Sequence, residues 1–293
     1  MRGRIIKGVS GDYSVHCGRE AGIYLCRARG LLRRDGRRPL VGDLAELEIL
    51  DEEKRLGSIR ELLPRRNELV RPAVANVDQA LVVFSMARPA PSFNLLDRFL
   101  VGMGQQGIPC IVCFNKRDLD QGQEGERCRE IYESCGYPSL AVSALEGAGL
   151  ERLRELLQGR TTVTAGPSGV GKSSLVNRLQ DGVVMATGEI SAKIHRGKHT
   201  TRHTELLPMG EDAYILDTPG FSSLGLFDLE KEELGGYYPE FGPHEKYCRF
   251  GGCSHTKEPD CGVKEAVEKG LISGLRYKNY CLLYQELKDE ARW

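Results

Sequence analysis

One short segment, Gly166-Pro-Ser-Gly-Val-Gly-Lys-Ser173, limits more than any other what this chain can fold into. It fits the pattern GxxxxGK[ST], in which glycines let backbone N–H groups face a phosphate and a helix N-terminus adds positive potential. The pattern requires a strand before it and a helix after it, and here a β-rich run (161–166) and a helical run (171–180) flank it. The sequence therefore predicts a phosphate-binding loop in an α/β domain. The residues expected around the phosphates are Gly166, Pro167, Ser168, Gly169, Val170, Gly171, Lys172, Ser173 and Ser174.

From Val77 to about residue 220, buried apolar runs alternate with helical periodicity. This alternation indicates a mainly parallel sheet covered by helices on both faces. Strands are expected at 79–86, 108–115, 139–144, 161–166, 204–209 and 213–220, and helices at 93–107, 125–136, 149–158 and 171–180.

The strand at 108–115 ends in Asn115, Lys116, Arg117 and Asp118, which resemble the NKxD sequence of guanine-binding proteins. A carboxylate such as Asp118 accepts hydrogen bonds from both N1–H and the 2-amino group of guanine, whereas adenine offers neither there. Asn115 can bond the purine edge and brace the loops, and the stem of Lys116 can cover the ring. Taken alone, the tetrapeptide is also compatible with an ordinary polar exit from a strand.

A second short sequence, Ser143-Ala144, ends the next expected strand. It resembles the SA motif whose backbone N–H approaches O6 of guanine. The dipeptide is weak evidence by itself, but with the tetrapeptide and the phosphate loop it indicates that the base is guanine.

Asp217-Thr-Pro-Gly220 ends the last apolar strand. In that position Asp217 would hold a Mg²⁺-bound water and the Gly220 N–H would face the γ-phosphate, while Lys172 would reach the β- and γ-phosphates and Ser173 would bind Mg²⁺. The basic segment 196–203 lies between the two motifs, and a threonine there, Thr201 in preference to Thr200, would complete the Mg²⁺ shell. The alternative is a basic loop that contacts something else.

The order of these motifs is unusual, because the base-binding sequences precede the phosphate loop. In an ordinary GTPase the phosphate loop comes first. A circular permutation keeps the same sheet but moves the chain ends, so that whatever follows residue 220 lies next to the switch end of the domain.

Residues 1–66 have a different pattern, with short alternating strands separated by polar turns, which suits a small β-barrel such as an OB-fold. They hold 15 basic and 10 acidic side chains, although the whole chain is neutral with 41 of each. On such a barrel the arginines of one loop region favour contact with RNA or DNA, and the alternative is a solvated loop. These arginines are Arg27, Arg29, Arg33, Arg34, Arg37 and Arg38.

After about residue 228 the chain carries a cysteine and histidine cluster and two helical runs, 263–270 and 275–292. Cys248, Cys253, His255 and Cys261 supply four ligands of the Cys₃His type, a common closed tetrahedral zinc site with no ligand to spare for catalysis. A chance group of buried thiols is the alternative. The predicted domains are therefore 1–66, 67–228 and 229–293.

Composition excludes other classes of protein. With 40% hydrophobic and 28% charged residues, the chain has the balance of a globular protein. No run is apolar and long enough to span a membrane, and the first residues lack a signal peptide, so a cytoplasmic location without a membrane partner is expected.

On these residues and their order, the chain resembles the permuted bacterial GTPases of the RsgA (YjeQ/YloQ) family over nearly its whole length. The resemblance implies an OB-fold, a permuted GTPase domain and a zinc domain that act in maturation of the small (30S) ribosomal subunit. It also implies contact with ribosomal RNA, GTP hydrolysis stimulated by the subunit, and release on hydrolysis.

One departure from common GTPases concerns the attacking water. Many small GTPases place a glutamine just after DxxG, but here Phe221 follows Gly220, and no glutamine lies nearby. The resemblance assigns the role to the histidine before the threonine pair, which is His199. A histidine can accept a proton or orient water at neutral pH, but His199 is also compatible with RNA contact or packing.

The sequence thus predicts a monomeric three-part GTPase that binds GTP and GDP, uses Mg²⁺ with GTP and carries one structural Zn²⁺. Two rival functions are a P-loop kinase of small molecules, which leaves the NKRD tetrapeptide without a role, and a non-enzymatic RNA-binding scaffold that holds GTP.

Overall fold

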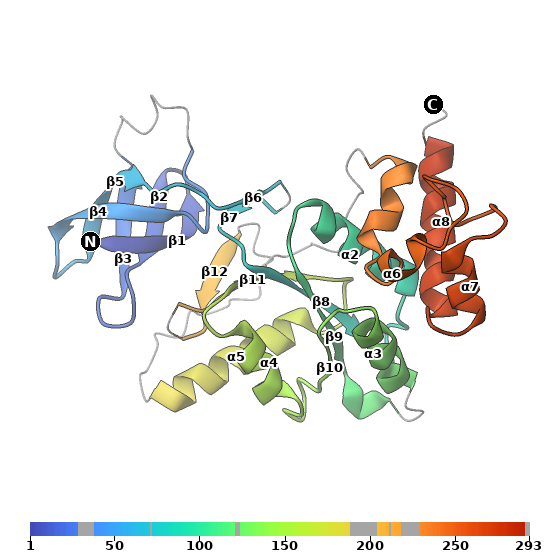
Figure 1. The fold of residues 1–293 in the computed structure, drawn as a ribbon. Helices are drawn as coiled ribbons and strands as arrows, with labels where there is room; N and C mark the ends of the chain where they lie inside the picture. Colours follow the sequence, from blue (N-terminus) through green and yellow to red (C-terminus); the bar gives the residue numbers. More distant parts are fainter. Residues whose placement is uncertain are drawn as a thin grey trace. The chain divides into compact units, whose positions relative to one another are not determined.

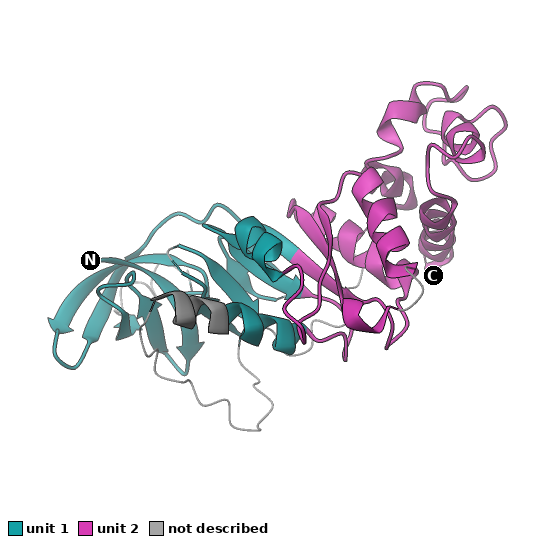
Figure 2. Cartoon of the chain, turned by 90° about the horizontal axis from the view of Figure 1, so that it is seen from below, with its two compact units in different colours: residues 1–80, 150–164, 172–221 teal, residues 81–149, 165–171, 222–293 magenta. Residues whose placement is uncertain are grey.

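The structure of the chain is a computed structural model that describes residues 1–28, 38–70, 72–120, 124–187, 204–210, 212–217 and 229–290, with no side-chain description for 181–187 and 217. The chain divides into two compact units (Figure 2). Unit 1 comprises residues 1–80, 150–164 and 172–221, and unit 2 comprises residues 81–149, 165–171 and 222–293.

Unit 1 begins with a closed β-barrel, drawn in blue in Figure 1. Its strands are β1 (Arg2–Val9), β2 (Asp12–His16), β3 (Ile23–Ala28), β4 (Leu44–Asp51) and β5 (Leu56–Leu62). They pair in the order β1-β2-β3-β5-β4, and β4 pairs back onto β1, so no edge is left open. Alternate side chains point inward and form a core of Ile5, Val15, Tyr24, Cys26, Ala45, Leu47, Ile59 and Leu62.

The remainder of unit 1 includes strands and helices that follow the barrel. A small pair, β6 (Glu68–Leu69) and β7 (Val74–Ala75), leads out of it. β11 (Thr161–Ala165) runs parallel to β13 (Tyr214–Asp217), which is antiparallel to β12 (Glu205–Pro208). β12 also pairs with barrel strand β1, where Lys7 lies opposite Glu205 and their side chains form an ion pair at 3.1 Å. The helices are α4 (Leu150–Leu157) and α5 (Lys172–Thr187).

Unit 2 contains the strands β8 (Gln79–Ser85, which starts in unit 1), β9 (Cys110–Asn115) and β10 (Ser139–Ala141), in the order β8-β9-β10. Every residue of β8 and β9 is buried, as expected for strands covered on both faces. α2 (Phe93–Gln105) follows β8, while the short 3₁₀ helix η1 (Arg117–Leu119) and α3 (Glu124–Ser134) follow β9.

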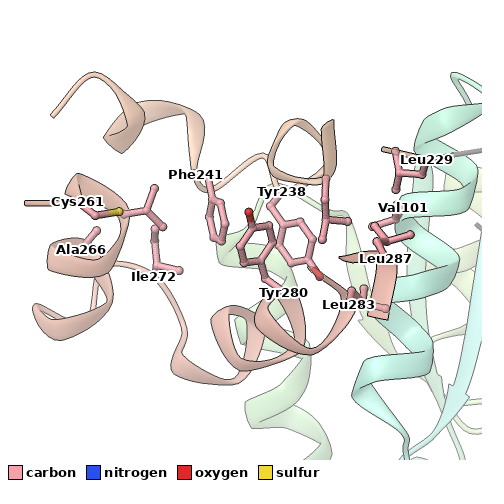
Figure 3. Packing of buried hydrophobic residues seen from close by; sticks show 12 residues of the cluster. Val101, Leu229, Tyr238, Phe241, Cys261, Ala266, Ile272, Tyr280, Leu283 and Leu287 are labelled. Carbon is pink, nitrogen blue, oxygen red and sulfur yellow. The ribbon is translucent and has the colours of Figure 1, made fainter. Parts of the chain in front are cut away.

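The C-terminal part of unit 2 consists of the 3₁₀ helix η2 (Lys231–Tyr237), α6 (Gly242–Glu245), α7 (Gly262–Glu268) and α8 (Gly274–Glu290). Its aromatic core, which includes Tyr238, Phe241 and Tyr280, is continuous with Val101 of α2 (Figure 3). The cysteine-rich segment therefore packs on one of the helices that flank β9.

These observations confirm the predicted fold class: a five-stranded barrel, an α/β domain, and C-terminal helices with a cysteine and histidine cluster. Within the described parts of the chain, no helix combines the length and the apolar character that crossing a membrane requires.

Candidate nucleotide site and metal centre

The phosphate loop passes so close to β8 that its first residue must be glycine. Gly166 has a φ of +131°, and a Cβ atom there would lie 2.1 Å from the Val83 carbonyl oxygen. A side chain is therefore excluded both by backbone conformation and by space. Further along the loop, a Cβ atom on Gly171 would lie 2.5 Å from Nδ2 of Asn115. The chain then enters α5 at Lys172, so the loop leads directly into a helix N-terminus.

Asn115, the last residue of β9, connects the phosphate loop to the segment after β10. It is 1% exposed. Its Nδ2 donates to the Val170 carbonyl oxygen at 2.9 Å, and its Oδ1 accepts from the Ala144 N–H at 3.1 Å. The donor and the acceptor of this one buried amide are thus each hydrogen-bonded to a different loop, which fixes the distance between the two loops.

Lys116 and Asp118 occupy the turn after β9. Lys116 has a left-handed φ of 65°, and its Nζ donates to the carbonyl oxygens of Gly169, at 2.7 Å, and Arg88. Asp118 accepts a hydrogen bond at Oδ1 from the Ser143 hydroxyl, which itself accepts from the Glu146 N–H. The structure therefore brings together Asn115, Lys116, Asp118, Ser143, Ala144 and the loop from Gly166 to Gly171.

Other residues predicted for this site are described less fully or not at all. Arg117 donates its backbone N–H to the Val142 carbonyl oxygen at 3.0 Å, and Ser173 and Ser174 are exposed in the first turn of α5. Asp217 ends β13, where only its backbone is described. His199, Thr200, Thr201 and Gly220 lie outside the described residues.

Sequence reasoning did not anticipate the segment after β8 as part of this site. The Arg88 carbonyl oxygen accepts from Lys116, and a Cβ atom on Gly169 would lie 3.7 Å from Cδ of Pro89. The Arg-Pro-Ala-Pro run at 88–91 signals a fixed turn, which was the available indication in the sequence.

The four predicted metal ligands lie together in the C-terminal part of unit 2. The ligand atoms of Cys248, Cys253, His255 and Cys261 all lie within 4.8 Å of one another. Nδ1 of His255 is 3.6 Å from Sγ of Cys248 and 3.4 Å from Sγ of Cys261, and those two sulfurs are 3.8 Å apart. This cluster can hold a metal ion, with Nδ1 as the histidine ligand atom.

A second layer of hydrogen bonds holds the segment that carries His255. Two tyrosines of α8 donate to backbone carbonyls there, Tyr277 to His255 and Tyr280 to Ser254, each at 2.8 Å. Glu258 accepts from the backbone N–H of Ser254 at 3.0 Å and from its hydroxyl at 2.6 Å. These donors lower the pKa of Glu258 to about 2, although burial acts in the opposite direction.

The predicted nucleic-acid arginines are only partly described. Arg27 forms an ion pair with Asp12 at 2.7 Å, and both side chains are exposed. The Arg38 carbonyl oxygen accepts from Arg65 at 2.7 Å. Arg29, Arg33, Arg34 and Arg37 lie outside the described residues.

A barrel followed by an α/β domain whose NKRD strand precedes its phosphate loop defines a circularly permuted GTPase. A family model described as RsgA GTPase matches residues 62–227, and one described as RsgA N-terminal domain matches residues 2–59. The chain belongs to the RsgA GTPase family, and it is therefore a GTP-hydrolysing enzyme.

Relatives and solved structures agree with this assignment over almost the full chain. A protein of Agathobacter rectalis named Small ribosomal subunit biogenesis GTPase RsgA is 52% identical over 302 residues, covering 100% of both chains. A protein of Alkaliphilus metalliredigens with the same name is 46% identical, covering 100% of this chain and 99% of the relative. The crystal structure of YloQ, described as a circularly permuted GTPase, matches with a TM-score of 0.79, 38% identity and coverage of 99% and 95%. YjeQ from Thermotoga maritima matches with a TM-score of 0.80, 38% identity and coverage of 98% of each chain.

Proposed function

We propose that this GTPase acts in maturation of the small (30S) ribosomal subunit, binding the subunit in its GTP form and leaving it after hydrolysis. Support comes from the names of relatives that are 52% and 46% identical over the whole chain. The three parts would divide the work: residues 1–66 contact ribosomal RNA, 67–228 hydrolyse GTP, and 229–293 form a metal-stabilised domain. The protein would act as a cytoplasmic monomer.

Guanine recognition is assigned to Asp118, which would accept hydrogen bonds from N1–H and the 2-amino group. The observation that carries this assignment is the pair of hydrogen bonds of Asn115, which join the end of β9, just before Asp118, to the phosphate loop and to the segment after β10. The Ala144 N–H would approach O6 of the base, and it would then be shared with Asn115, to which it already donates. Arg117 lies between these residues and contributes its backbone to the turn.

The phosphates would lie along the loop from Gly166 to Ser174, with Lys172 compensating the charge of the β- and γ-phosphates. Ser173, Thr201 and Asp217 would hold Mg²⁺, which neutralises negative charge on the phosphates when bound, and the Gly220 N–H would face the γ-phosphate. Water would attack the γ-phosphate directly, without a covalent intermediate. His199 would orient that water, because Phe221 stands where other GTPases carry glutamine. Intrinsic turnover would therefore be slow, because without that glutamine the water is poorly placed until a partner binds.

The metal is assigned as zinc. Four ligands around a tetrahedral ion with Zn–S bonds of about 2.3 Å would separate sulfurs by about 3.8 Å and sulfur from nitrogen by about 3.6 Å. The distances of 3.8 Å between Sγ of Cys248 and Cys261, and of 3.4 and 3.6 Å from Nδ1 of His255, support this size. Glu245 lies 3.5 Å from Nε2 of His255, where a carboxylate orients a ligating imidazole. All four side chains would be used as ligands, so the ion would be structural.

The RNA contact is assigned to the arginine-rich segment from Arg27 to Arg38. Arg27 already pairs with Asp12, but the pair is exposed and therefore weak, so a phosphate can replace the carboxylate. Arg29, Arg33, Arg34 and Arg37 would add to the same positive segment. Neutralising several phosphates would make the affinity for RNA fall steeply with salt.

The deciding experiment measures GTP hydrolysis with and without purified small ribosomal subunits, with ATP as the nucleotide control. Strong stimulation with GTP and none with ATP is the expected result. GTP hydrolysis that purified subunits leave unchanged, at protein concentrations where subunit binding would be saturated, would contradict the ribosomal assignment while leaving the GTPase intact.

A further inference from the structure

The most completely buried basic side chain in the described parts of unit 2 is that of Arg276, near the start of α8. It is 1% exposed, although arginine is rarely buried to this degree without partners. Its Nε donates to Oε1 of Glu240 at 2.8 Å, and its Nη1 donates to Oδ1 of Asp97 in α2. The guanidinium also lies 4.4 Å from the ring centre of Tyr238. Burial lowers the pKa of Arg276, but the two carboxylates outweigh this effect and raise it well above its ordinary value, so the group stays charged.

Asp97 connects this arginine to a second helix of the α/β domain. Besides Arg276, it accepts from the Tyr132 hydroxyl of α3 at 2.8 Å and from Nδ2 of Asn279 at 2.7 Å. Asp97 is 0% exposed, and these three side chains are its hydrogen-bond donors. A buried carboxylate needs such donors, so loss of one of them would disturb the packing of α2, α3 and α8 together.

The network leads to the loop of Asp118 by two routes. The Tyr132 ring packs against Phe114, 6.0 Å between ring centres, and Phe114 directly precedes Asn115 in β9. α2 itself follows the segment whose Arg88 carbonyl accepts from Lys116. Thus α3 contacts the strand that leads into the tetrapeptide 115–118, and α2 follows the segment that is hydrogen-bonded to Lys116.

We propose that Arg276 is a positioning residue for guanine recognition: through Asp97 and Tyr132 it holds the helices on both sides of the base loop. This inference rests on the assignment of Asp118 to the base. The C-terminal segment then contributes to nucleotide specificity, because a residue of α8 affects how accurately Asp118 is positioned to accept a hydrogen bond from the 2-amino group. Coupling of this kind requires contiguous contacts, and each step from Arg276 to Asn115 is a buried contact or a peptide bond.

The test compares the dissociation constants of GDP and IDP, because inosine lacks the 2-amino group and the ratio therefore reports the placement of Asp118. The variants are Arg276→Gln and Tyr132→Phe, the second of which removes only one hydroxyl and keeps the ring. Both should lower the preference for GDP over IDP by about fivefold or more, as expected for coupled sites. General destabilisation would weaken both nucleotides alike and leave the ratio unchanged.

A matched control is available on the same two helices. Arg98 of α2 pairs with Glu286 of α8, but this pair is partly exposed, with side chains 21% and 42% exposed, and it does not involve Asp97. Arg98→Gln should leave the ratio unchanged. An unchanged ratio in folded Tyr132→Phe protein, or an equal fall in Arg98→Gln, would overturn the inference. The wild-type ratio is the separate control for Asp118: equal binding of GDP and IDP would contradict the base assignment itself.

Discussion

At the scale of single residues, the site depends on a few side chains with two partners each. Asn115 is the best example, because its two hydrogen bonds account for both ends of a buried amide. A substitution that keeps only the donor or only the acceptor of this amide should not be tolerated, since one of the two loops then loses its hydrogen bond to Asn115. The same reasoning makes Asp118 a residue whose replacement should change the preferred base as well as weaken binding.

Replacing Asp118 by asparagine should convert the guanine preference toward xanthine. The asparagine amide donates where the carboxylate accepted, so it repels the 2-amino group of guanine but matches the 2-oxo group of xanthine. Two charge-assisted hydrogen bonds are then replaced by a single neutral one to N1–H, which should weaken GTP binding by about a hundredfold or more. Titration with GTP and XTP measures both effects, and a variant that keeps its GTP preference would contradict the assignment of Asp118.

Replacing His199 by alanine tests the proposed orientation of water. The expected result is a fall of about 10²-fold or more in the kcat of subunit-stimulated hydrolysis, with the dissociation constant of GTP unchanged, as for loss of a general base. Single-turnover hydrolysis and equilibrium binding separate the two quantities. If kcat is unaltered, another group orients the water.

At this scale, the candidate site could be predicted wherever its chemistry requires particular residue types at a particular spacing in the sequence. Phosphate loop, NKRD tetrapeptide and metal ligands each combine fixed residue types with fixed spacing. Arg276 could not be predicted, because its partner Asp97 lies 179 residues away and nothing local distinguishes either residue. The Arg88 carbonyl was missed for a related reason, since a backbone acceptor leaves no trace in residue type.

At the scale of elements, close backbone approach explains the glycine that directly follows β11. Substituting Gly166 by alanine should destabilise the protein by about 3 kcal/mol or more and remove GTP binding, since φ is positive and the new Cβ would overlap the Val83 carbonyl. Gly11→Ala is the matched control, because its φ is +91° but nothing lies within 4 Å of the added Cβ. It should cost about 1 kcal/mol. Chemical denaturation measures both, and equal costs would show that the close approach to β8 is unimportant.

The α8 tyrosines should control the affinity of the metal centre. Tyr277→Phe removes the hydrogen bond to the His255 carbonyl, so the ligand loop loses support and the metal affinity should fall by about 10- to 100-fold. Competition with a chelator provides the measurement. Tyr284→Phe in the same helix is the control, because its contact with Tyr280 is between rings and is kept in phenylalanine. A Tyr277→Phe protein with unchanged affinity would contradict this role.

Elements were predictable where periodicity was simple. The buried strands β8 and β9 and the barrel strands follow from their apolar patterns, and the helical runs after residue 260 became α7 and α8. What α8 contacts was not predictable. Its buried residues, at 276, 279, 280, 283 and 287, have helical spacing, but the first two are Arg276 and Asn279, which a search for apolar residues passes over.

At the scale of the whole molecule, removing the metal should affect two observables at once. Cys253→Ser, or chelation, should unfold the C-terminal segment, since binding of structural zinc is coupled to folding. Because Val101 of α2 shares that segment's core, nucleotide binding should weaken as well. Thermal denaturation and GDP titration of the same sample test this prediction, and a Cys253→Ser protein of equal stability and activity would contradict a structural metal.

The burial of Asp97 also has a consequence for how the chain is made. Its carboxylate needs Arg276 and Asn279, which are synthesised 179 and 182 residues after it. During translation α2 and α3 must therefore wait, with a charged side chain that cannot yet be buried, until α8 has left the ribosome exit tunnel. A chain that ended before residue 276 would contain every nucleotide-binding motif and still lack a fixed base pocket, so it would compete poorly for GTP.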